Sequence, residues 1–160
     1  MIKLLDLLKE DSPFISRGGK ERVETYSLKR KAEIENKIQE YVKNGMEGDL
    51  DLFDTPITSL PSNLTKVGGD LILNRTEITS LNNLTKVEGD LSLFRTPITS
   101  LPDNLTVEGD LDLNNSKITT LPKNLTVGGD LYLSYTPLSR KYSEDEIIAM
   151  VPNVEGGIDI

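Results

Sequence analysis

The 160-residue chain contains neither cysteine nor histidine, and aromatic residues make up only 5% of it. Without cysteine it can form no disulfide and no thiolate metal site. Without histidine it lacks the commonest general base and the commonest transition-metal ligand. The sequence also shows no nucleophile paired with a base, no phosphate-binding loop and no metal-ligand cluster. We therefore expect no enzyme activity, no catalytic residues, no metal and no cofactor.

Positive charge is scarce in most of the chain. There are 18 Lys and Arg residues against 26 Asp and Glu residues, which gives a net charge of −8. The acidic excess begins after residue 47, because residues 1–47 hold 10 basic and 9 acidic groups whereas residues 48–160 hold 8 and 17. Ordinary nucleic-acid binding needs Lys and Arg to displace counterions, so we do not expect it here. The acidic part favours a basic partner or serves solubility alone.

Long hydrophobic runs are also absent from the sequence. The apolar residues of Met1–Leu8 are interrupted by charge, and the stretch is too short for an export signal or a membrane span. We therefore expect a cytoplasmic monomer that does not bind membranes.

The chain does contain a repeat. The tripeptide Gly-Asp-Leu occurs five times at spacings of 21, 20, 20 and 20 residues, beginning at Gly48, Gly69, Gly89, Gly109 and Gly129. Most copies continue through a Thr-x-Ile or Ser-x-Ile step to Asn-Leu-Thr, and three contain a Leu-Pro turn. A fixed period in the twenties is the signature of a solenoid, in which each repeat stacks on its neighbours.

Apolar residues occupy the same places in every repeat. In Leu71-Ile72-Leu73 the two leucines face the same side of a strand, and four further apolar positions recur before the next copy. Six such positions in each of four complete repeats give 24 residues for one continuous core. A Thr or Ser column follows the strand, and we expect its hydroxyls to satisfy backbone groups: Thr55, Thr76, Thr96, Ser116 and Thr136.

The run Leu-x-Leu-x-x-Thr-x-Ile-x-x-Leu-Pro-x-x-Leu resembles the leucine-rich repeat, and is closest to the short bacterial class of about 20 residues per repeat. Thr or Ser stands where that family usually has Asn, and Val-x-Gly-Asp precedes the strand. The resemblance implies an α/β repeat solenoid with one parallel β-sheet of five to six short strands. The chain as a whole is also similar to uncharacterised repeat proteins of tailed bacteriophages.

The segments outside the repeats are expected to cap them. We predict a short amphipathic helix over 1–10, a flexible linker over 11–19, a capping helix over 20–47, leucine-rich repeats over 48–138 and a C-terminal cap over 139–160. In the C-terminal cap, Ser143 and Glu146 form a capping box that opens a short helix. Ile158-x-Ile160 matches Leu131-x-Leu133, which predicts a final strand.

The resemblance implies that side chains alternating with the buried leucines line the concave face of the sheet. They form three columns across the five copies. The first is Asp49, Asp70, Asp90, Asp110 and Asp130; the second is Asp51, Ile72, Ser92, Asp112 and Tyr132; the third is Phe53, Asn74, Phe94, Asn114 and Ser134. The second and third vary while their surroundings repeat, and exposed Phe and Tyr are typical anchors for a protein partner. We name all three columns as candidate partner-binding residues.

The invariant aspartate column needs an explanation of its own. Carboxylates on adjacent parallel strands stand about 4.8 Å apart, which corresponds to roughly 3 kcal/mol of repulsion per neighbouring pair at an effective dielectric near 20. Either backbone amides of the glycine-rich corner satisfy these carboxylates, or cations do, whether bound ions or groups of a partner.

Three functions are compatible with the sequence. The first is a protein-interaction module that binds an unidentified partner on the concave face. The second is a phage-encoded inhibitor of a host protein that uses its acidic surface. The third is a virion-packaged internal protein, because Leu8-Lys9-Glu10 resembles the cleavable targeting peptides of phage prohead proteins, which implies processing after Glu10.

Overall fold

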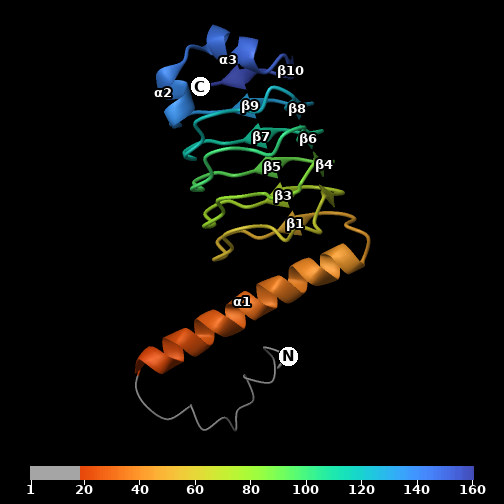
Figure 1. Cartoon of the computed structure of the whole chain (residues 1–160), viewed down its shortest axis with the longest axis vertical. Coiled ribbons are helices and arrows are strands. Elements are labelled where there is room, and N and C mark those ends of the chain that lie inside the picture. Colours follow the sequence, from red (N-terminus) through yellow and green to blue (C-terminus); the bar gives the residue numbers. More distant parts are fainter. Residues whose placement is uncertain (1–18) are drawn as a thin grey trace. The chain divides into compact units, whose positions relative to one another are not determined.

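The structure, a computed structural model, describes residues 19–160, with side chains described from residue 28 onward (Figure 1). The chain divides into two compact units, Met1–Glu40 and Tyr41–Ile160, which we treat separately. The predicted helix over 1–10, the processing site at Glu10 and residues 11–18 of the predicted linker lie outside the described residues.

Helix α1 spans Gly19–Lys43, so a helix is present where one was predicted over 20–47, although it includes Gly19 of the predicted linker and ends at Lys43. It ends before Gly45, which adopts a positive φ of 91° as a helix stop. The hydroxyl of Tyr41, in the last turn, donates to Gly48 O at 2.8 Å and accepts from Gly68 N at 3.2 Å. These contacts join the end of the helix to the first two repeats. The predicted capping role of the rest of this helix stays a prediction.

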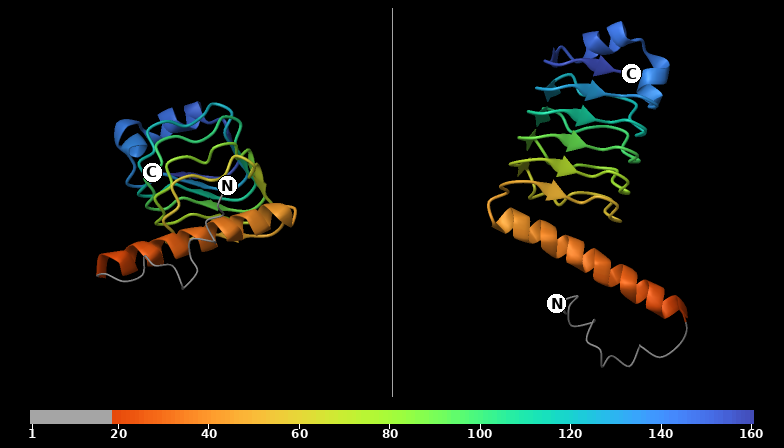
Figure 2. Two further views of the ribbon diagram at one scale, coloured as in Figure 1. Left: turned by 60° about the horizontal axis from the view of Figure 1, so that its bottom comes forward. Right: turned by 180° about the vertical axis from the view of Figure 1, so that it is seen from behind.

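The body from Tyr41 onward is a solenoid in which every repeat forms one turn (Figures 1 and 2). One strand per turn enters a six-stranded parallel sheet, in the order β1-β3-β5-β7-β9-β11. These strands are β1 (Leu50–Asp51), β3 (Leu71–Ile72), β5 (Leu91–Ser92), β7 (Leu111–Asp112), β9 (Leu131–Tyr132) and β11 (Ile158–Asp159). The register aligns the repeats, since Leu71 pairs with Leu91 and Leu91 with Leu111. This is the predicted sheet.

A second parallel sheet, which was not predicted, runs along another side of the solenoid. It has five strands in the order β10-β8-β6-β4-β2. They are β2 (Lys66–Val67), β4 (Lys86–Val87), β6 (Thr106–Val107), β8 (Thr126–Val127) and β10 (Asn153–Val154). The sequence did not reveal it, because each of its strands contributes a single inward valine instead of an alternating pair such as Leu71 and Leu73. The prediction included only the burial of its valines in the core.

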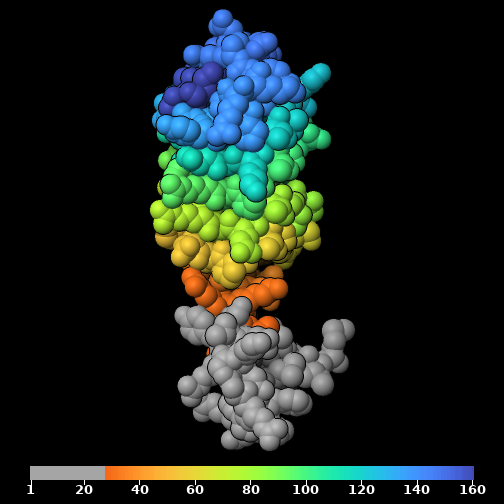
Figure 3. Space-filling model, turned by 90° about the vertical axis from the view of Figure 1, so that its left-hand side faces the viewer, coloured from red at the N-terminus to blue at the C-terminus, as the bar shows by residue number. Residues whose placement is uncertain are grey.

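The core lies between the two sheets and the turns that join them. Of the 24 apolar positions predicted for the core, all except Ile57 and Leu121 are buried. The predicted role of the Thr column is also confirmed, since the hydroxyls of Thr76 and Thr96 donate to the carbonyl oxygens of Leu73 and Leu93 at 2.7 and 2.8 Å. Among the described residues, no buried side-chain nitrogen or oxygen lacks a hydrogen-bond partner. The repeats consequently stack as tight layers (Figure 3).

In the last turn of the solenoid, two short helices stand between β9 and β10, where the earlier turns have a loop. Helix α3 spans Glu144–Met150 and has the predicted capping box of Ser143 and Glu146. Helix α2, Pro137–Lys141, was missed, although Thr136 caps it and Pro137 opens it, which is a recognised helix-start signal. Strand β11 pairs with β9 with Ile158 opposite Leu131, as predicted from the matching sequence.

Candidate binding surface

The second predicted column lies along the middle of the outward side of the six-stranded sheet. Its members are register partners, with Asp51 opposite Ile72, Ile72 opposite Ser92, Ser92 opposite Asp112 and Asp112 opposite Tyr132. The structure extends the column by Asp159 of β11, which pairs with Tyr132. Sequence reasoning missed Asp159, although the Ile158-x-Ile160 alternation contained the signal. We call the three predicted columns together with Asp159 the sheet face.

The aspartate column lies at the start of each strand and forms a ladder of hydrogen bonds. The Oδ1 atoms of Asp49, Asp70, Asp90 and Asp110 each accept the backbone N–H of the aspartate one turn later, at 2.8 to 2.9 Å. At the end of the ladder, Asp130 accepts the N–H of Gly157 at 2.7 Å. Of the two explanations left open by the sequence, backbone amides therefore satisfy one oxygen of every carboxylate in the column.

The ladder explains why glycine precedes each of these aspartates after the first. A Cβ atom on Gly89 would collide with Oδ1 of Asp70, and one on Gly109 would collide with Oδ1 of Asp90. The same Cβ atoms would press on the backbone of the preceding turn. Each glycine thus leaves room for the carboxylate below it, so glycine and aspartate form one structural device.

Two groups of the sheet face have shifted pKa values. Burial raises the pKa of Asp112, against the opposing effect of the 2.8 Å hydrogen bond from Asn114 N. The negative charge of Asp130 and then partial burial raise the pKa of Tyr132, whose hydroxyl donates to Oδ2 of Asp130 at 3.2 Å. Tyr132 therefore stays protonated at neutral pH, with its one hydroxyl hydrogen donated to Asp130.

The third column stands where each strand ends and combines structural and exposed residues. Oδ1 of Asn74 accepts from Phe94 N at 2.9 Å and from Ser92 Oγ at 2.7 Å. Phe53, in contrast, leaves 49% of its surface exposed. The asparagines therefore support the turn, whereas Phe53 is available for contact.

A fourth column, missed by sequence reasoning, follows the third at the corner of each turn. Its members are all exposed and all adopt positive φ, between 52° and 62°: Asp54, Arg75, Arg95, Asn115 and Tyr135. The guanidinium of Arg75 lies 5.8 Å from the ring centre of Phe53, and that of Arg95 lies 5.1 Å from the ring centre of Phe94. The variation of this column within a regular repeat was the signal that could have revealed it.

Cationic and aromatic side chains are thus concentrated along one edge of the sheet face. We call this edge the arginine–aromatic strip, defined by Phe53, Arg75, Phe94, Arg95 and Tyr135. Arginine and aromatic residues are enriched at the energetic centres of protein interfaces, because they combine a large contact area with polar groups. Tyr135, at 73% exposed, is the most exposed of the large hydrophobic side chains that the structure describes.

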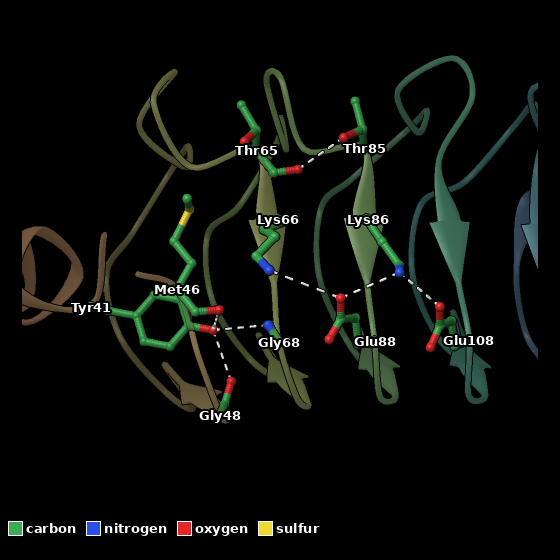
Figure 4. A network of polar contacts seen from close by, with 10 residues as sticks. All are labelled: Tyr41, Met46, Gly48, Thr65, Lys66, Gly68, Thr85, Lys86, Glu88 and Glu108. Carbon is green, nitrogen blue, oxygen red and sulfur yellow. Dashed lines mark hydrogen bonds and ion pairs between the residues drawn. The ribbon is translucent and has the colours of Figure 1, made fainter. Parts of the chain in front are cut away.

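The side chains on the outside of the second sheet satisfy one another. Lys86 lies 2.8 Å from Glu108 and 3.3 Å from Glu88, and Lys66 lies 4.0 Å from Glu88 (Figure 4). The hydrogen bonds to Glu108 and Glu88 raise the pKa of Lys86, so the lysine stays charged at neutral pH. These exposed ion pairs balance charge locally, in contrast to the sheet face, whose three columns contain no Lys or Arg.

The described residues contain no cluster of three or more His, Cys, Asp or Glu side chains arranged to hold a metal ion. None of the described helices combines the length and apolar character needed to cross a membrane.

Comparison with known proteins gave no match: no family model, no curated protein and no solved structure is significantly similar to the chain. The leucine-rich-repeat and phage resemblances therefore stay predictions.

Proposed function

We propose that the chain is a protein-interaction module that binds a partner protein through the sheet face and the adjoining arginine–aromatic strip. One observation carries this proposal: exposed aromatic side chains stand where strands β1 and β9 of the six-stranded sheet end, at positions that vary from turn to turn within a repeating scaffold. Phe53 is 49% exposed and Tyr135 73% exposed, although neither is needed to fill the core. Exposed aromatic residues on a regular surface are typical of a binding site.

The repeated positions of the solenoid have structural roles, which leaves the variable positions for binding. The leucines and valines form the core, the Thr column satisfies strand carbonyls, and the Gly-Asp pair builds the ladder. The central and third columns, by contrast, change from turn to turn. A surface whose residues differ while its scaffold repeats can match the irregular surface of a partner.

A second candidate function is inhibition of another protein, whose basic site the acidic surface would occupy. It is favoured by the eight carboxylates of the sheet face: Asp49, Asp51, Asp70, Asp90, Asp110, Asp112, Asp130 and Asp159. If these charges dominate, the affinity for the partner falls steeply between about 0.05 and 0.5 M salt, because exposed charges are screened. If the aromatic anchors dominate, the affinity changes little over that range.

The test compares two variants with the wild type by affinity capture from native extract, followed by mass spectrometry. The face variant carries Phe53→Ser, Phe94→Ser and Tyr132→Ser. The control variant carries Ile148→Ser, which removes a 47%-exposed apolar side chain from helix α3 and leaves the sheet face intact. Circular dichroism establishes that both variants fold.

We expect a partner that the wild type and the control capture and the face variant loses. With the purified partner, the face variant should bind roughly tenfold more weakly or worse, because interface aromatics commonly contribute 1 to 2 kcal/mol or more each. Equal affinity of all three proteins would contradict the proposal.

A further inference from the structure

The corner after each strand of the six-stranded sheet places one residue in the left-handed backbone region. There, Asp54 and Asn115 suit the conformation, because Asp and Asn tolerate positive φ. Arg75, Arg95 and Tyr135 adopt φ values of 58°, 56° and 62°, which side chains of their size disfavour. The backbone does not explain these three residues, and strain of this kind points to a role for the side chain.

The two arginines occupy the same corner in neighbouring turns. Arg75 N donates to the carbonyl oxygen of Phe94, the residue before Arg95, at 2.9 Å, so the two backbones are direct neighbours. Within the part of the chain that the structure describes, each guanidinium lies over an aromatic ring and neither takes part in an ion pair. Two positive charges therefore stand on neighbouring turns, each against the face of an aromatic ring.

A guanidinium over an aromatic ring can still bind an anion. The ring contacts the flat face of the guanidinium group. The five N–H donors of the guanidinium point outward in the plane of that group. Those donors match a carboxylate in a two-bond arrangement. Phe53 and Phe94 add apolar area beside the two charges. The strip therefore has the composition of a site for an acidic group flanked by an apolar side chain.

The surroundings decide which class of acidic partner fits. The eight carboxylates of the adjoining sheet face repel a long polyanion, so the strip suits a short acidic stretch rather than a nucleic-acid backbone. We infer that the arginine–aromatic strip binds a segment of the partner protein that carries Asp or Glu next to an aromatic or large aliphatic residue. The acidic side chains meet Arg75 and Arg95, and the apolar one packs on the rings. This inference rests on the proposed function and specifies the chemistry of the partner.

The test uses the full chain and an array of fluorescent ten-residue peptides in matched sets, read by fluorescence anisotropy. One set combines Asp or Glu with Phe or Leu, a second replaces the acids by Asn and Gln, and a third replaces them by phosphoserine. The strip variant carries Arg75→Asn and Arg95→Asn. The control carries Lys117→Gln and Lys123→Gln, which remove the same charge at two exposed lysines outside the strip.

We expect the wild type and the control to bind acidic peptides and to prefer them over the amide set. The strip variant should bind them at least roughly tenfold more weakly, because two charge-assisted hydrogen-bonding groups are lost. Asn115 already occupies the same corner at φ 57°, so the Arg→Asn variant keeps a suitable backbone and should melt at the wild-type temperature or above. Should that variant melt lower, a second one with Arg75→Lys and Arg95→Lys keeps the charge without the planar fork, and must also bind more weakly.

Three results would overturn the inference: no peptide binds, the amide or phosphoserine set binds as tightly as the acidic set, or the strip variant keeps the wild-type affinity. The experiments distinguish failure of this inference from failure of the proposed function. If the purified partner from the capture experiment needs Phe53, Phe94 and Tyr132 but tolerates the loss of both arginines, the sheet face binds protein and only the acidic-segment assignment is wrong.

Discussion

At the scale of single residues, the Gly-Asp pair of each repeat shows how a short motif can serve the fold. Asp90 accepts the N–H of Asp110 across one turn, and Gly109 leaves space for the Asp90 carboxylate. The sequence revealed the column and the need to offset its repulsion. It could not choose between cations and amides, because the donor comes from a residue 20 positions away whose N–H is oriented by the stacking of the turns.

The ladder predicts a difference between two substitutions at Asp90. Asp90→Ala leaves the N–H of Asp110 without its acceptor and should lower the free energy of unfolding by about 1 to 2 kcal/mol. Asp90→Asn keeps a carbonyl oxygen at the same place and removes one charge from an acidic column, so it should cost less than the alanine variant. Urea unfolding measures both. Equal losses would mean that the hydrogen bond contributes nothing.

Asp112 predicts a pH effect. Burial raises its pKa in the folded chain above the unfolded value, so the folded state binds the proton more tightly and the charged carboxylate is unfavourable to folding. This unfavourable contribution is present at neutral pH and disappears as the pH falls through the raised pKa. Asp112→Asn, which retains an oxygen for the N–H of Asn114, should therefore melt at a higher temperature than the wild type at pH 7.

The melting-temperature difference should begin to shrink as the pH falls through the raised pKa, and it should be lost below the ordinary pKa of aspartate, near about 3.9. Thermal unfolding of both proteins across that range tests this expectation. A difference that is independent of pH, or a less stable variant at pH 7, would contradict it.

At the scale of elements, a helix or strand could be predicted only where consecutive residues carry a signal for it. The capping box of Ser143 and Glu146 is local, and helix α3 begins where it predicted. Helix α2 had an equally local signal in Thr136 and Pro137, but Thr136 had been assigned to the Thr column; it does both, donating to Leu133 O and capping the helix. The second sheet had no comparable local signal, because each of its strands has one inward valine and no Leu-x-Leu alternation.

The capping box predicts the stability of the C-terminal turn. Ser143 Oγ accepts the N–H of Glu146, and a carboxylate oxygen of Glu146 accepts the N–H of Ser143 at 2.8 Å. Ser143→Ala should lower the free energy of unfolding by about 1 kcal/mol, because the first turn loses its cap. Ser143→Asp supplies another capping oxygen and serves as the control. An alanine variant as stable as the aspartate variant in urea would show that the cap is dispensable.

At the scale of the whole molecule, the solenoid from Tyr41 to Ile160 depends on contacts between turns. A single turn has no core of its own, so its leucines are buried only when turns lie above and below. The wholly buried Leu93 and Leu113 belong to neighbouring turns and illustrate this dependence. The burial pattern was predicted from periodicity, whereas the exposed Arg75, Arg95 and Tyr135 were not singled out, since nothing in consecutive residues marks their corner.

Leu113 predicts how strongly the turns depend on one another. Leu113→Ala should lower the free energy of unfolding by about 2 to 5 kcal/mol, because it leaves a cavity that the neighbouring turns fill only in part. Phe53→Ala, at a position 49% exposed, should cost much less and serves as the control. A small loss at Leu113 in chemical unfolding would mean that the turns relax independently.

The sequence by itself determined the period, most of the buried positions of each turn, the start of helix α3 and the final strand, because these depend on residues that follow one another along the chain. Only the tertiary structure decided three features: the second sheet, the backbone N–H that donates to each aspartate carboxylate, and the positions of Arg75 and Arg95 against aromatic rings. Those features arise when residues about 20 positions apart are stacked at the spacing of a parallel sheet, and their geometry is set by that stacking.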